Sequence, residues 1–128
     1  MSGESEEGPE VRLTTGEVAE VLGVPYGTLA QWIRDDLVGV GEIKTHKINR
    51  YLFDYPATFA ALVVAELRRL GMRPRKASSV VYGMLQGGRR PLWEIGALVV
   101  MRPNGTSLRV DLAGMHARLK ERLAQIGQ

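Results

Sequence analysis

The chain has 128 residues, of which 45% are hydrophobic and 24% are charged, and it carries a formal net charge of +3 and no cysteine. This size and composition predict one folded domain with a small appendix, and the lack of cysteine excludes disulfides, thiol nucleophiles and thiolate metal sites. Because the sequence has neither an apolar run of about 18 residues nor a secretory signal at its start, we expect no membrane association and a cytoplasmic location.

The charges are unevenly distributed along the sequence. Residues 1–10 contain four glutamates and no basic residue, and their Gly, Ser and Pro content predicts a disordered acidic tail. All 17 Lys and Arg residues lie from Val11 onward, so the body of the chain is basic. A basic body attracts polyanions such as DNA, although an ordinary solvated surface would have the same composition.

Residues 13–38 have the pattern of two short helices joined by a tight turn. Thr14 or Thr15 is the expected N-cap of the first helix, and Glu17 lies at capping-box spacing after Thr14. Gly23 is expected to end that helix in a left-handed conformation. This order is the helix-turn-helix pattern, in which the second helix enters a groove of duplex DNA.

The second helix is expected from residue 25 or 26 to residue 34. Its apolar face would consist of Leu29, Trp32 and Ile33, with Trp32 in the core rather than at a contact. Its exposed face would carry Tyr26, Thr28, Gln31 and Arg34.

These exposed side chains match the chemistry of DNA contacts. Gln pairs bidentately with adenine and Arg with guanine in the major groove, so we expect Gln31 to contact a base, the alternative being a solvated amide. Arg34 suits either a contact with a base or an ion pair with a neighbouring acidic residue. Thr28 near the helix start suits a phosphate or a local cap, and Tyr26 suits a phosphate or a cover for the turn.

Residues 39–53 predict two short strands around a basic tip, which is the shape of a wing. Lys44, Lys47 and Arg50 cluster there, and side chains of this kind contact phosphates or enter the minor groove. The alternative is a solvated hairpin. His46 at the tip is expected to be a surface residue rather than a metal ligand.

Two further helices are expected after this hairpin. Pro56 in the first turn and an apolar stripe from Phe59 to Leu70 predict one helix that ends at Gly71. The next is expected from about Pro74 to Gln86. Its buried positions would be Ala77, Val80, Val81, Met84 and Leu85. The cations at its start form a candidate second phosphate contact: Arg73, Arg75 and Lys76.

Residues 88–128 change in character. Residues 97–101 read as a strand, Asn104-Gly105 is a strong hairpin signal, and Leu108, Val110 and Leu112 alternate with polar residues. A last helix is expected over residues 114–126, with an apolar seam of Leu112, Met115, Leu119, Leu123 and Ile126. We expect a dimerisation or partner-binding unit, the alternative being that it packs back onto residues 11–87.

The N-terminal region resembles the DNA-binding domain of the MerR family of bacterial regulators. Typical members begin with T-x-G-E-x-A-x-x-x-G-V-x-x-x-T-L-R-Y-Y. The matching residues here are Thr14, Gly16, Glu17, Ala19, Gly23, Val24, Thr28 and Leu29. Arg50-Tyr51 is similar to the Arg-Tyr of the family's wing, and residues 67–72 are similar to the L-R-x-L-G-F segment that precedes its second wing.

The resemblance covers residues 11–86 and implies a winged helix-turn-helix that binds double-stranded DNA, with Tyr51 among its contacts. Two departures bear on function. Ala30-Gln31-Trp32 stands where the family has Arg-Tyr-Tyr, and a hairpin and a short helix follow where typical members have a long coiled coil and a sensor segment. The resemblance therefore does not carry over effector sensing or promoter twisting.

The sequence thus predicts a mainly α fold with a small β component: a MerR-like winged helix-turn-helix of about four helices and a β wing, then a β-hairpin and a C-terminal helix. The expected domains are a tail over 1–10, a DNA-binding domain over 11–87 and the C-terminal unit over 88–128. The expected function is a dimeric repressor or autoregulator that binds an inverted repeat.

Two alternatives come from other classes of function. One is an antitoxin of a toxin–antitoxin pair, whose C-terminal unit binds a partner protein. The other is a small-molecule sensor built around Trp93, Met101 and Met115, although such residues are more often core. No phosphate loop, metal-spaced cluster or activated nucleophile is present in the sequence, so we expect no enzymatic activity, no cofactor and no metal.

Overall fold

The computed structural model describes residues 11–39, 41–44, 49–88 and 90–126, and for 41–44 and 49–51 it describes the backbone alone. The predicted tail over 1–10, and Lys47 and His46 at the predicted wing tip, lie outside the described residues.

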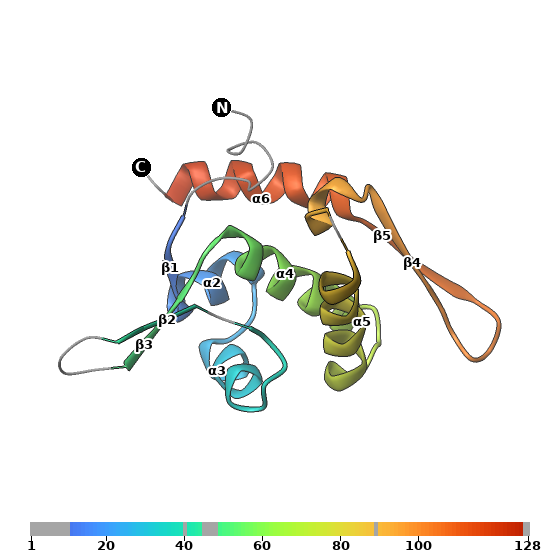
Figure 1. The fold of residues 1–128 in the computed structure, drawn as a ribbon, viewed down its shortest axis with the longest axis horizontal. Coiled ribbons are helices and arrows are strands. Elements are labelled where there is room, and N and C mark those ends of the chain that lie inside the picture. Colours follow the sequence, from blue (N-terminus) through green and yellow to red (C-terminus); the bar gives the residue numbers. More distant parts are fainter. Residues whose placement is uncertain (1–10, 40, 45–48, 89, 127–128) are drawn as a thin grey trace.

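The described part of the chain is mainly helical with two small antiparallel sheets, as predicted (Figure 1). The helices are α2 (Thr15–Leu22), α3 (Tyr26–Arg34), α4 (Tyr55–Arg69), α5 (Pro74–Gly87) and α6 (Leu112–Ile126), with a short 3-10 helix η1 (Leu92–Glu94). The strands are β1 (Leu13–Thr14), β2 (Gly41–Lys44), β3 (Asn49–Phe53), β4 (Ala97–Met101) and β5 (Ser107–Asp111).

Local signals place α2 and α3 where the sequence predicts them. The Glu17 N–H donates to Thr14 Oγ1 at 3.2 Å, and the Thr14 N–H donates to Glu17 Oε1 at 2.9 Å, which completes the capping box. Gly23 ends α2 with φ 74°, a left-handed conformation that glycine adopts without a steric cost. Leu29 and Trp32 bury the inner face of α3.

The first sheet contains the predicted hairpin and one strand that the sequence did not indicate. Its order is β1–β3–β2, all antiparallel, with Leu13 opposite Phe53 and Lys44 opposite Asn49. Strand β1 has two residues, too few to produce a recognisable alternation. It ties the start of α2 to the end of the hairpin.

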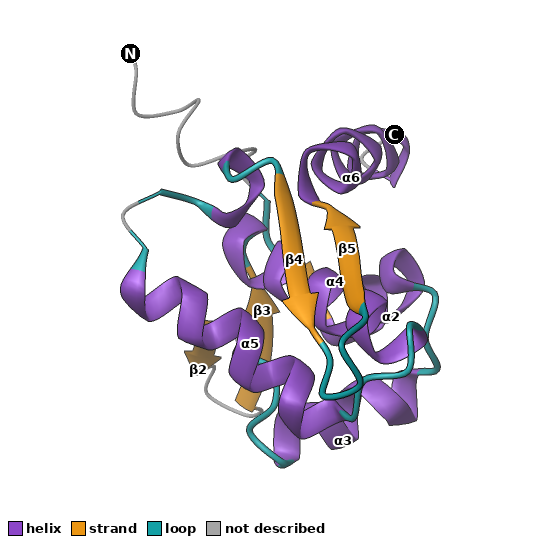
Figure 2. Ribbon diagram, turned by 90° about the vertical axis from the view of Figure 1, so that its right-hand side faces the viewer, coloured by secondary structure: helices purple, strands orange, loops and turns teal. Residues whose placement is uncertain are grey.

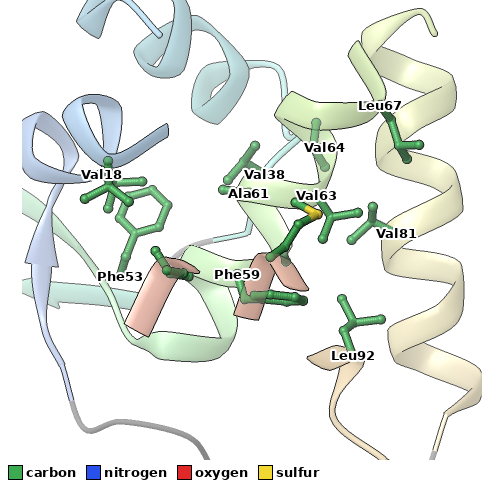
Figure 3. Close-up of a cluster of buried hydrophobic side chains, with 14 of the residues drawn as sticks. Val18, Val38, Phe53, Phe59, Ala61, Val63, Val64, Leu67, Val81 and Leu92 are labelled. Atoms are coloured by element: carbon green, nitrogen blue, oxygen red, sulfur yellow. The ribbon is translucent and has the colours of Figure 1, made fainter. Parts of the chain in front are cut away.

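Helix α4 lies at the centre of the core, between α2 and β3 on one side and α5 and η1 on the other (Figure 3). Phe59, Val64 and Leu67 of α4 are completely buried, and Figure 3 shows α4 between Val18 and Val81. The prediction for α5 was wrong at Leu85, which is 38% exposed. The whole stretch 85–88 is exposed, because none of the described elements covers the last turn of α5.

The second sheet is the hairpin of β4 and β5. Its tip is the loop of residues 102–106, in which the Arg102 N–H donates to the Thr106 carbonyl at 2.8 Å and the Gly105 N–H donates to the Arg102 carbonyl at 3.0 Å. Gly105 has φ 89°, as a loop of this type requires. Arg102 Nη2 also donates to the Leu70 carbonyl at 3.3 Å, which holds the tip against the turn between α4 and α5.

Helix α6 lies across α2 and α4, on the opposite side of the molecule from α3 (Figures 1 and 2). It begins at Leu112 rather than at Gly114, because Asp111 Oδ1 accepts the Gly114 N–H at 3.0 Å. Its buried residues are Leu112, Met115, Leu119 and Leu123, while Ile126 is 41% exposed. Four of the five residues in the predicted apolar seam therefore face the core of their own chain, and the prediction was wrong at Ile126, which lies in the last turn of the helix.

Polar and aromatic contacts fix α6 to this core. Arg122 Nη1 donates to the Val21 carbonyl at 2.6 Å, and the Tyr55 hydroxyl is hydrogen-bonded to His116 Nδ1. The His116 ring stacks on Trp93 with a centroid separation of 5.6 Å. The predicted boundary at residues 87/88 does not separate two cores, since one buried cluster contains residues from both sides of it.

Candidate nucleic-acid interface

The outward face of α3 carries most of the side chains predicted to contact DNA. Tyr26 is 62% exposed, and Gln31 and Arg34 are exposed as well. Thr28 is half-buried and lines a cavity rather than the open face. The helix is held in this orientation by Leu29 and Trp32 on its inner side.

Three side chains near the end of α3 form a hydrogen-bonded row. Arg34 Nη2 donates to Gln31 Oε1 at 2.7 Å, and Gln31 Nε2 donates to Asp35 Oδ1 at 2.9 Å. An amide oxygen accepts two hydrogen bonds and an amide nitrogen donates two, so Gln31 retains one acceptor and one donor. A bidentate contact with adenine requires that pair. The role of Asp35 in orienting Gln31 was not predicted.

The loop after α3 is fixed to α5 by one long-range hydrogen bond. The Gly39 N–H donates to the Tyr82 hydroxyl at 2.8 Å, and Gly39 packs close to the Tyr82 ring. Burial raises the pKa of Tyr82, and Asp36 adds to this, while the hydrogen bond from Gly39 acts in the opposite direction. Asp36 turns the chain with φ 59° directly after α3. This turn and the hydrogen bond between Gly39 and Tyr82 connect the end of α3 to α5.

The N-termini of α3 and α5 differ from those of the other described α-helices. Side chains cap α2, α4 and α6, through Thr14, Asp54 and Asp111. The N-cap residues of α3 and α5 are Pro25 and Arg73, which make no side-chain cap bond, and neither helix has an acidic residue in its first turn. The N–H groups at these two ends are therefore left without a carboxylate or hydroxyl acceptor, which favours binding of an anion.

These two N-termini border one cavity of about 390 Å³, which we call the α3–α5 cavity. Its lining residues are Leu22, Gly23, Val24, Thr28, Trp32, Leu62, Ala65, Glu66, Arg68, Arg69 and Pro74. Arg69 Nη2 lies 2.7 Å from Glu66 Oε2, and this hydrogen bonding lowers the pKa of Glu66. Arg68 is exposed on the rim and was not among the predicted contacts.

Two of the predicted cations at the start of α5, Arg73 and Arg75, flank Pro74 at this cavity, whereas Lys76 lines a second cavity next to the β4–β5 hairpin. Arg73, Arg75 and Lys76 are all exposed. Figures 1 and 2 both place the first turn of α5 at the same end of the molecule as α3. The structure thus brings the start of α3 and the start of α5 together, although Thr28 and Pro74 are far apart in the sequence.

In Figure 1 the hairpin of β2 and β3 projects at the left of the molecule, and α3 lies at the bottom. Lys44 belongs to β2, and Arg50 and Tyr51 belong to β3, opposite Ile43 and Glu42. The described backbone places these three residues on one hairpin.

Other candidate sites are weaker. Among the described residues, no three His, Asp or Glu side chains are grouped to hold a metal ion. Trp93 and Met115 are buried in the core, whereas Met101 is 67% exposed on β4, so the residues of the sensor alternative do not form one site. No helix of the described residues could cross a bilayer. No family model matches the sequence, and no curated protein matches it.

Proposed function

We propose that this chain is a sequence-specific DNA-binding transcriptional regulator of the MerR-like winged helix-turn-helix type. In this proposal α3 enters the major groove, where Gln31 contacts an adenine and Arg34 a neighbouring base. As a dimeric repressor or autoregulator, the protein would occupy an inverted repeat, and occupancy alone is sufficient for repression.

One observation carries the proposal: the uncapped N-termini of α3 and α5 border the same cavity, with Arg68 in its lining and Arg73 and Arg75 on either side of Pro74. Phosphate binds at helix N-termini because unsatisfied N–H groups and the helix dipole both favour an anion. Arg73 and Arg75 add charge at this position, and Lys76 is the next residue along α5. A phosphate held here would fix the register of α3 on the duplex.

The remaining contacts flank this position. Tyr26 and Thr28 suit phosphates near the start of α3. The β2–β3 hairpin serves as the wing in this proposal, with Lys44, Lys47, Arg50 and Tyr51 toward the DNA backbone or the minor groove. Such contacts would add affinity rather than choice of sequence.

The test is selection of binding sites from random duplexes by the full chain, followed by fluorescence anisotropy over a salt series. We expect one enriched inverted repeat, bound with submicromolar affinity that falls linearly with salt on logarithmic axes. Gln31→Ala should reduce discrimination at one base pair by about 5- to 150-fold, which corresponds to the worth of one bidentate contact.

The matched control is Gln125→Ala, which truncates an exposed glutamine on α6, away from α3. This variant should bind like the wild type. Failure to enrich any duplex, or equal discrimination by Gln31→Ala and the wild type, would refute the proposal.

A further inference from the structure

Strand β4 has one edge that no strand of the described residues pairs with. Because the Arg102 N–H is bonded to the Thr106 carbonyl, the alternation of an antiparallel ladder directs the peptide groups of Leu98 and Val100 toward β5. The N–H and C=O groups of Ala97, Val99 and Met101 then point to the opposite edge. Figure 2 shows β5 running alongside β4.

The side chains on this edge are apolar and exposed. The hairpin buries Leu98 and Val110 against the body, while Val99 is 53% exposed and Met101 is 67% exposed on the other face. The strand Ala97–Met101 contains no charged residue and no proline. Natural proteins normally protect a free edge with such residues or cover it, so an unprotected edge of this kind indicates a pairing surface.

We propose that β4 pairs with β4 of a second copy of this chain, antiparallel, about a two-fold axis at Val99. The axis places Val99 opposite the partner's Val99, and Ala97 opposite the partner's Met101. In this register the peptide groups that point away from β5 bond each other, so each opposed pair exchanges two hydrogen bonds. The result is a four-stranded sheet with the order β5–β4–β4–β5.

The strand is complementary to itself in shape. The small Ala97 would be covered by the partner's long and adaptable Met101, and the same contact recurs across the axis. On the other face Leu98 would lie opposite the partner's Val100. A two-fold interface requires one patch to fit its own copy, and this five-residue strand satisfies that requirement without a shift in register.

The charges near the seam do not oppose the pairing. Arg109 of β5 lies opposite Val99 of β4. In the four-stranded sheet the two Arg109 residues would be separated by three strand spacings, or about 14 Å. This exceeds the distance of about 8 Å over which salt screens exposed charges, so their repulsion is weak.

A different protein could pair with β4 instead, as the antitoxin alternative would require. In that case the purified chain would be monomeric.

The test is sedimentation equilibrium of the full chain without DNA, so its outcome does not depend on the proposed function. The wild type should dimerise with rising concentration. Val99→Lys and Val99→Glu should each weaken the dimer by about tenfold or more, because like charges would face each other across the axis. An equimolar mixture of the two variants should dimerise again as a heterodimer.

Leu85→Lys is the matched control, since it introduces the same charge at another exposed apolar position. It should dimerise like the wild type, and thermal melts should show that all variants fold. A monomeric wild type would overturn the proposal. Dimers of undiminished strength from Val99→Lys, or a mixture that remains monomeric, would also overturn it.

Discussion

Replacing Arg73 with serine separates the stability of α5 from the proposed phosphate contact at its first turn. Arg73 is the N-cap residue, with φ −67° and ψ 148°, and its side chain makes no cap bond. A serine in this conformation accepts a hydrogen bond from the N–H of Arg75 or Lys76. The same substitution removes a cation and occupies a donor that a phosphate would use. We therefore expect a protein that is more stable but binds DNA more weakly.

The magnitudes follow from the cap and from the lost charge. A good N-cap contributes about 1 kcal/mol, which for a chain of this size raises the melting temperature by about 3–5 °C. Loss of one phosphate contact lowers the slope of log affinity against log salt by about 0.9. Stability and affinity thus change in opposite directions, whereas a substitution that damages the fold would lower both.

Thermal melts and anisotropy titrations over a salt series measure the two effects. Lys120→Ser on α6 is the control, because it removes an exposed charge of the same sign away from α3 and α5. It should leave both the melting temperature and the salt slope nearly unchanged. If Arg73→Ser gains stability and keeps the wild-type affinity and slope, the start of α5 does not bind phosphate. If it loses stability, the N–H groups there already have partners.

Three further predictions concern the fold. Leu119→Ala leaves a cavity at a buried position of α6 and should lower the free energy of unfolding by about 2–5 kcal/mol. Denaturant unfolding of this variant should remain a single transition, and a separate transition for α6 would contradict the shared core. Burial and the charge of Lys120 lower the pKa of His116, and Glu94 acts in the opposite direction. As the pH falls, His116 is therefore protonated at a higher pH in the unfolded chain than in the folded one. The free energy of unfolding should decrease as the pH drops below about 6.5. Between about pH 8 and 5 the melting temperature should vary less for His116→Gln than for the wild type. Equal variation in the two proteins would show that His116 does not cause the pH dependence. Tyr82→Phe removes the acceptor of the Gly39 N–H and should cost about 0.5–1.5 kcal/mol by urea unfolding; unchanged stability would show that this contact is not needed.

Local sequence patterns were sufficient to predict the α-helices and the two hairpins, because the causes of these elements lie within a few residues. The capping box at Thr14 and Glu17, the left-handed Gly23 and the cap at Asp54 fix helix ends without reference to the rest of the chain. The exposed face of α3 also followed from helical spacing, since Leu29 and Trp32 define its opposite side. Even the missing caps of α3 and α5 could have been noticed from the residue types before each helix.

The tertiary structure alone decided where the last helix packs and how the candidate site is assembled. An apolar seam of Leu112, Met115 and Leu119 looks the same in a sequence whether its own core or a second copy covers it, and only the packing against α2, α4 and η1 resolves this. In the same way, Thr28 and Pro74 meet at one cavity because α4 carries the chain back past α3. Contacts between residues so far apart depend on the packing of whole elements, which no local pattern encodes.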